Sequence, residues 1–420
     1  MAALAVPASA LSAASTGSPA VGRASGLIDG HAGAVHRASA DAFVARDVMI
    51  DADGTEHVRF DRTWRGLPVI GGDVVVHSRN GQYRGASLSL RTAARPLGTE
   101  RVGRNAAIVA AGAEFGTGFA GVPTARKVVY ARGAQPVLAW EVVMNGMRAD
   151  QTPTEMHYFV DARNGRVLDR FDGIETKGKP GGGGSGVTCT TSASGTGQSL
   201  FSGDVGISTV RCSDGTYQMT DLTRGGGYTT DLANRTNGSG TVFSDADNNW
   251  GDNTTGNRAT VAADAHYGVA ETWDYYKNVH GRNGIANDGK GALSRVHYGR
   301  NYGNAFWSDS CFCMTFGDGG GSIYPLVDID VAGHEMSHGV TSRSANLTYS
   351  GESGGLNEAT SDIVGTMVEF YSNNANDTPD DLIGEELYVT NPSGTKALRY
   401  MFKPSLDGTY QMTDLTRGGG

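Results

Sequence analysis

Hydrophobic and polar residues alternate along much of the first 175 residues, in a pattern typical of β-strands. The alternating runs are HVRFDRTWRGLPVIGGDVVVH (57–77), KVVYA (127–131), PVLAWEVVM (136–144) and MHYFVDARNGRVLDRF (156–171). The last run contains Asn164-Gly165, a pair that favours the tight turn of a hairpin. The pattern predicts a small α+β region.

A different periodicity appears in the second half of the chain. The segment ATVAADAHYGVAETWDYYKNVHG (259–281) repeats apolar positions every three or four residues, which predicts a long helix. Short strands and turns rich in Gly, Asn and Asp precede it, and the strand-like runs SRVHYG (294–299) and NAFW (304–307) follow it. We expect a β-rich lobe over 187–332, followed by helices over 333–406.

The two patterns are separated by KGKPGGGGSG (177–186), whose residues favour a flexible linker. At the other end, residues 1–22 are small and apolar, with no basic residue before Arg23. We interpret them as a trimmed signal peptide, and a flexible Ala/Ser tail is the alternative. No apolar run approaches the roughly 20 residues of a membrane helix, so we expect no membrane partner.

Charge differs between the two halves. Residues 1–180 contain 21 basic and 17 acidic side chains, a net charge of +4, whereas the remaining 240 residues have a net charge of −13. The halves could attract each other, or the difference could simply favour solubility. The acidity of the second half argues against a nucleic-acid partner. Four cysteines permit complete pairing and favour export, but the pairing of Cys311 and Cys313 stays open.

The pattern with most chemical content lies in DIDVAGHEMSHGVTSR (328–343). His334 and His338 are four residues apart, so on a helix they share one face and can bind a common ion. Glu335 leaves the helix about a quarter turn away, where it could reach a water on that ion instead of the ion itself. This HExxH arrangement predicts a metal site with a base beside it.

A catalytic zinc site usually has three protein ligands and one open position. Glu358, in GGLNEATSD, opens a second predicted helix and supplies the third ligand. We expect an apolar face to hold this helix in place, made of Leu356, Ile363, Met367 and Phe370. Asp362 lies one turn after Glu358, where it can accept the outer N–H of a ligating histidine and fix its tautomer.

These residues resemble the thermolysin-like neutral zinc proteases, for which two histidines and one glutamate are the standard zinc ligands. The likeness extends through DAHYGVAETWDYYKNVHGR, NAFW, IDVAGHEMSH, GGLNEATSD, VEFY, IGEEL and ALRYM, and covers about 259–404. Residues 23–100 resemble a fungalysin/thermolysin propeptide and 101–176 a PepSY domain. The resemblance implies an α+β zincin: a β-rich N-terminal lobe with an active-site helix, preceded by an α+β prosegment.

The resemblance also implies a role for each matching residue. His334, His338 and Glu358 would bind one zinc ion, and Glu335 would be the base that activates its water. Tyr349 would help to hold the oxyanion. The other matching residues would bind the substrate. Asn304 and Ala305 would bind its backbone, and Arg399 would bind one of its carbonyl groups. Leu398 and Val331 would line an apolar pocket.

A calcium site is a further implication of the resemblance. Asp330, Glu369, Asp380 and Glu385 match carboxylates that bind calcium behind the active site in the family. Leu382 stands where a second calcium would require a carboxylate, so we predict one calcium ion. The alternative is that these acidic residues only decorate the surface.

The segment DGTYQMTDLTRGGG occurs twice, at 214–227 and at 407–420. A repeat architecture would show several diverged copies at a regular period, so we interpret 407–420 as a join in the gene or its assembly. A deliberate tandem motif is the alternative. The family has a further catalytic histidine, and this sequence has none after His338. We therefore expect the C-terminal helical lobe to be mostly missing, the apolar side chains of Leu356, Ile363 and Met367 to lack cover, and the chain as written to be unstable and weakly active.

Together these patterns predict a secreted, extracellular zinc metalloendopeptidase made as a zymogen. Its substrates would be proteins and peptides, and its own prosegment would act as an intramolecular chaperone and inhibitor. A secreted zinc-binding protein without catalytic activity is the alternative.

Overall fold

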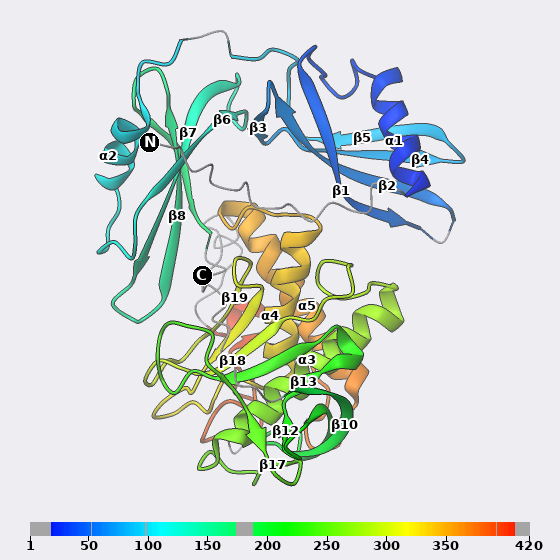
Figure 1. Ribbon diagram of the computed structural model, residues 1–420, viewed down its shortest axis with the longest axis vertical. Coiled ribbons are helices and arrows are strands. Elements are labelled where there is room, and N and C mark those ends of the chain that lie inside the picture. The colour runs from blue at the N-terminus through cyan, green and yellow to red at the C-terminus, as the bar shows by residue number, and fades with distance from the viewer. Residues whose placement is uncertain (1–17, 52, 97–98, 174–187, 392, 408–420) are drawn as a thin grey trace. The chain divides into compact units, whose positions relative to one another are not determined.

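A computed structural model of the chain describes residues 18–51, 53–96, 99–173, 188–391 and 393–407 (Figure 1). The chain divides into two compact units, one made of residues 1–145 and 156–170 and the other of 146–155 and 171–420. The predicted linker, most of the predicted leader and residues 408–420 of the second DGTYQMTDLTRGGG copy lie outside the described residues.

The first unit is built on a nine-stranded sheet with the order β5-β4-β2-β3-β6-β7-β8-β9, in which β1 also pairs with β2. The strands are β1 Asp41–Ile50, β2 Thr55–Trp64, β3 Leu67–Ile70, β4 Val74–Arg79, β5 Gln82–Leu88, β6 Thr124–Tyr130, β7 Val137–Met147, β8 Pro153–Asp161 and β9 Val167–Asp172. Helix α1 (Pro19–Gly30) packs on β1, β2 and β4, and α2 (Arg104–Gly112) contacts β6.

The alternating pattern of the sequence is visible in this sheet. In β2 every second residue is buried, from Glu56 to Arg62. The predicted hairpin turn joins β8 and β9, with Gly165 at φ +77°. The end of the predicted leader forms the first turn of α1, where Ala20 and Val21 are buried. The boundary at residue 22 therefore stays a prediction.

The second unit contains two further sheets. One has the order β16-β12-β11-β10-β17 and the other β13-β14-β18-β20-β19, with β15 beside β14. Their strands are β10 Cys189–Gln198, β11 Asp204–Cys212, β12 Tyr217–Gln218, β13 Thr220–Asp221, β14 Gly227–Asp231, β15 Thr241–Val242, β16 Ser244–Asp245, β17 Asn249–Gly251, β18 Leu293–Tyr298, β19 Ala305–Ser308 and β20 Cys313–Gly317. A disulfide between Cys189 and Cys212 joins opposite positions of β10 and β11.

Three long helices lie side by side in this unit (Figure 1). The predicted helix is confirmed as α3 (Arg258–His280), which begins after the Asn257 cap and ends at Gly281 with φ +65°. The motif-bearing helices are α4 (Ile329–Arg343) and α5 (Gly351–Ser372). The remaining short elements are η1 Leu222–Arg224, β21 Leu382–Ile383, β22 Arg399–Tyr400 and η2 Pro404–Asp407.

Glycine allows α4 and α5 to approach closely. A Cβ atom on Gly333 of α4 would lie 3.0 Å from the Cα of Gly365, and one on Gly365 would lie 2.5 Å from the carbonyl oxygen of Asp330. The expected apolar face does not make this contact: its four members, Leu356, Ile363, Met367 and Phe370, are 44–54% exposed. The expectation that this face holds the helix was wrong, because small and polar residues of α5 face α4 instead. The exposure of Leu356, Ile363 and Met367 agrees with the expectation that these side chains lack cover.

Candidate active site

The three predicted zinc ligands converge on one point between α4 and α5. His334 Nε2 lies 2.9 Å from His338 Nε2, and the Glu358 carboxylate lies 3.4 Å from the first and 3.6 Å from the second. One ligand atom from each residue lies within 4.8 Å of the others. Both histidines are less than 10% exposed. Three converging donors of this kind fit a zinc ion with one open position.

The outer nitrogen of each histidine is held by α5. His334 Nδ1 lies 2.7 Å from Asp362 Oδ1, as the sequence predicts, and His338 Nδ1 lies 2.7 Å from Asn357 Oδ1. Such contacts fix the tautomer and aim the other nitrogen at the metal. Sequence reasoning missed Asn357, although it directly precedes the glutamate ligand.

Burial and neighbouring charges set the protonation states of the three predicted zinc ligands. Burial lowers the pKa of His338 to about 4, so this imidazole is neutral and can bind metal. For Glu358, burial raises the pKa, but the two histidines more than offset this, and the carboxylate stays ionised. For His334, burial lowers the pKa, but the hydrogen bonds and charges of Asp362 and Glu358 outweigh burial and raise it to about 10. The metal-free site therefore presents a neutral His338, an anionic Glu358 and a protonated His334, and a bound cation would replace the proton on His334.

Glu335 lies beside the ligands but outside their cluster. Its side chain is buried, and among the described residues its Oε2 atom has no hydrogen-bond partner. Burial raises the pKa of Glu335 to about 7. A buried carboxylate with a free oxygen and this pKa can take up and return a proton near neutral pH.

The structure places Tyr349 and Arg399 at the same site. The Tyr349 hydroxyl donates to Glu358, and its ring lies 6.0 Å from that of His338. Arg399 donates to both oxygens of Asp362, at 2.7 and 2.6 Å. Sequence reasoning did not foresee this bidentate contact, which connects Arg399 to the zinc ligand His334 through one carboxylate.

The predicted substrate-binding residues occupy different environments. Ala305 begins β19, which pairs with β20 alone among the described strands, and exposed Asn304 directly precedes it. An edge strand of this kind leaves backbone groups available for an added strand. Leu398 packs on the apolar core, and Val331, in the first turn of α4, is 4% exposed.

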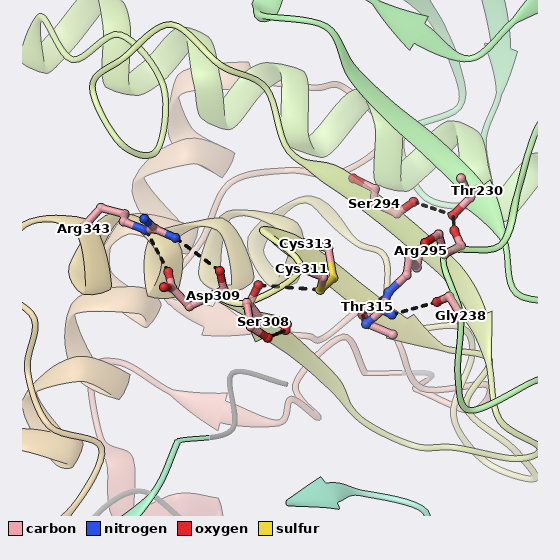
Figure 2. Close-up of a disulfide and its surroundings, with 12 residues drawn as sticks. Thr230, Gly238, Ser294, Arg295, Ser308, Asp309, Cys311, Cys313, Thr315 and Arg343 are labelled. Atoms are coloured by element: carbon pink, nitrogen blue, oxygen red, sulfur yellow. Dashed lines mark hydrogen bonds and ion pairs between the residues drawn. A yellow bond between two sulfur atoms is a disulfide. The ribbon is translucent and has the colours of Figure 1, made fainter. Parts of the chain in front are cut away.

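The β19–β20 turn is fastened to the end of α4 (Figure 2). Cys311 and Cys313, whose pairing the sequence left open, form a disulfide in this turn. Arg343 donates to Asp309 at 2.8 Å and lies 5.3 Å over the Phe312 ring. Further along the strand, a Cβ atom on Gly339 would lie 2.8 Å from the Trp307 indole, so β19 packs directly on the α4 backbone.

A second acidic cluster lies near the start of α4. Ligand atoms of Glu369, Asp377 and Glu385 lie within 4.8 Å of one another, and Asp330 is buried beside them, where it accepts from the Gly384 amide at 2.6 Å. Within the described part of the chain, buried carboxylate oxygens of Glu369, Asp377 and Glu385 lack hydrogen-bond donors. This arrangement fits a hard cation.

The structure changes the membership predicted for this cluster. Asp377 belongs to the compact group, although sequence reasoning did not select it. Asp380 lies outside that group and accepts from the Leu382 amide at 2.6 Å, and Leu382 itself is 8% exposed in β21.

Comparison with known families agrees with this geometry. The model of the thermolysin metallopeptidase catalytic domain matches residues 194–342, and that of the thermolysin metallopeptidase alpha-helical domain matches residues 345–417. The fungalysin/thermolysin propeptide motif matches residues 41–90. The PepSY assignment of residues 101–176 stays a prediction.

Similar proteins extend the comparison along most of the chain. The transglutaminase-activating metalloprotease of Streptomyces mobaraensis is 49% identical over 88% of this chain and 46% of its own length. Thermolysin of Alicyclobacillus acidocaldarius subsp. acidocaldarius is 38% identical over 85% of this chain and 65% of its own length. Bacillolysin of Bacillus cereus is 36% identical over 89% of this chain and 68% of its own length. The chain thus spans from about half to two thirds of these relatives. It belongs to the thermolysin family of metallopeptidases.

Proposed function

We propose that this chain is the precursor of a zinc metalloendopeptidase that hydrolyses peptide bonds in proteins. The observation that carries the proposal is the convergence of His334, His338 and Glu358 beside a buried glutamate with a free oxygen.

The proposed mechanism assigns separate tasks to the residues of the site. A zinc ion held by the three ligands would polarise the scissile carbonyl and lower the pKa of a bound water. Glu335 takes a proton from that water and later gives it to the leaving amine. Asp362 holds the His334 tautomer. The exposed edge of β19 at Asn304 and Ala305 binds the substrate backbone as an added strand.

Two further residues are proposed to act on the substrate. Tyr349 reaches Glu358 and would turn its hydroxyl to the developing oxyanion. Arg399 would bind a substrate carbonyl while Asp362 holds its guanidinium, and Leu398 and Val331 would border the apolar pocket.

The decisive experiment combines zinc content with peptide hydrolysis. Glu335→Gln should keep one bound zinc and lose roughly 100- to 10,000-fold in hydrolysis, because a positioned base contributes on this order. Glu358→Gln should lose the zinc itself. Glu352→Gln, in the first turn of α5, is the matched control and should change neither. Hydrolysis by Glu335→Gln at the parent rate would contradict the mechanism.

The other parts of the proposal rest on separate observations. One calcium ion is proposed at Asp330, Glu369, Asp377 and Glu385, where buried carboxylates lack donors, with Asp380 beside them. Residues 23–176 are proposed as the prosegment, supported by the propeptide match. Secretion is supported by the pairing of all four cysteines, because disulfides persist mainly outside the cytosol. None of the described helices has the length and apolar character of a membrane span.

A further inference from the structure

A second pair of histidines faces one another on the sheet of the first unit. His57 of β2 and His77 of β4 are direct cross-strand partners. Their Nδ1 atoms lie 2.6 Å apart, and their ring centroids lie 4.9 Å apart with an interplanar angle of 71°. At this distance one Nδ1–H donates to the other Nδ1. A metal ion bound to both nitrogens at about 2.1 Å in tetrahedral geometry would replace that proton and move them to about 3.4 Å apart.

The outer nitrogens of both rings already have partners. His57 Nε2 lies 2.9 Å from the Asp51 carboxylate, which can only accept, so this nitrogen carries the proton. In this tautomer the Nδ1 atom of His57 carries a lone pair. His77 Nε2 lies 2.8 Å from the Ser87 hydroxyl. Carboxylate and hydroxyl contacts of this kind orient imidazoles that bind metals.

The predicted zinc site of the same chain provides a direct comparison. There the facing nitrogens are 2.9 Å apart, the centroids 4.6 Å apart and the rings at 87°. The outer nitrogens contact a carboxylate and an amide oxygen, each at 2.7 Å. The sheet pair thus resembles the two histidines of the helix site in that both outer nitrogens are held, but among the described residues no third donor corresponds to Glu358.

The surroundings permit a cation. The neighbouring arginines are paired with acids: Arg59 with Asp73, and Arg79 with Asp53 at 3.1 Å. Gly85 lies opposite His77 in β5, and a Cβ atom there would meet nothing within 4 Å. This open space leaves room for water ligands.

We propose that His57 and His77 bind a divalent transition-metal ion through their two Nδ1 atoms, with water completing its coordination. Imidazole suits zinc, copper and nickel, and two donors are fewer than the usual set of a structural zinc site. We therefore expect weaker binding than at His334, His338 and Glu358. The inference does not depend on the proposed function, because it concerns a different unit and a different ligand pair.

The test is calorimetric titration of the full chain with zinc. The chain carries Glu335→Gln to prevent self-cleavage and is first saturated with calcium. It should take up one tight zinc and one weaker zinc. His57→Asn and His77→Asn should each weaken the second event at least tenfold and leave the first unchanged. His31→Asn is the matched control, because this histidine lies in the same unit and stacks on Tyr83.

A further variant separates this site from the predicted catalytic zinc. With His338→Ala added, the tight event should disappear and the weaker one should remain. If only the tight event is absent from the parent, the zinc site of the proposed function fails and the histidine pair stands. If the weaker event is absent from the parent, a shared proton occupies the pair and the inference is overturned. If the weaker event persists in both histidine variants with unchanged circular dichroism, that zinc binds elsewhere and the inference is overturned as well.

Discussion

The close crossing of α4 and α5 predicts that a single methyl group on Gly365 will weaken metal binding. In Gly365→Ala the new Cβ would lie 2.5 Å from the carbonyl oxygen of Asp330 and 3.5 Å from the backbone nitrogen of His334. Because non-bonded atoms pack at about 3.5–4.0 Å, the helices must separate by on the order of 1 Å. This change separates His334 from Glu358, which lie on different helices.

The magnitude follows from the cost of overpacking. Inserting a methyl group into a closely packed contact costs about 1–3 kcal/mol. If bound zinc holds the helices at their present separation, this strain opposes binding, and it corresponds to roughly a 5- to 150-fold loss of zinc affinity. The variant should also unfold at a lower temperature, because the contact is strained without metal as well.

Competition with a chelator measures the zinc affinity of the parent and the variant. Gly26→Ala in α1 is the matched control, because a Cβ atom there meets nothing within 4 Å. Alanine at a helix interior is favoured over glycine by about 1 kcal/mol, so this control should keep its zinc affinity and lose no stability. A Gly365→Ala chain with parental affinity and melting temperature would refute the reasoning.

Three further predictions concern stability. Burial and neighbouring carboxylates raise the pKa of Asp377 to about 7 and that of Glu385 to about 9, above their values in the unfolded chain. The calcium-free fold therefore binds extra protons and should lose stability as the pH rises from about 4, the pKa of these groups in the unfolded chain, to about 9, and thermal melting should show calcium removing this loss. Replacing Cys311 and Cys313 by serine should lower the free energy of unfolding in urea by at most about 1.5 kcal/mol, because the closed loop is very short. It should also raise the KM for peptides, because the disulfide holds the β19–β20 turn next to the proposed substrate-binding edge. Asp41 pairs with the buried Arg62 and Arg95. Asp41→Asn leaves both arginines without this partner and should lower the free energy of unfolding of the first unit by about 3–5 kcal/mol, measured in urea. The exposed Asp29→Asn should lower it little.

Local patterns in the sequence were sufficient for much of the fold. Periodicity identified α3, and the Asn164-Gly165 pair identified the β8–β9 hairpin. The spacing of His334 and His338 placed both on one helical face, where the structure has them. Each of these features depends on neighbours within a few residues, and for that reason one sequence is enough to predict it.

Other features depend on residues far apart in the chain. The apolar positions of α5 suggested the wrong packing face, because periodicity shows which residues share a face but not what covers it. Asp377 joins the acidic cluster through a loop whose path no local pattern encodes. Gly365 is one of 62 glycines, and only the crossing of two helices distinguishes it from the others.

The contact between Trp307 and Gly339 has a consequence for how this protein could change over time. The indole of Trp307, on the proposed substrate-binding edge, lies against the backbone of the helix that carries His338, with no intervening side chain to absorb a shift. A substitution that repositions this edge for a new substrate will therefore also displace an imidazole. Selection for altered specificity should favour changes in the surrounding loops, where the sequence can vary without weakening zinc binding at the proposed site.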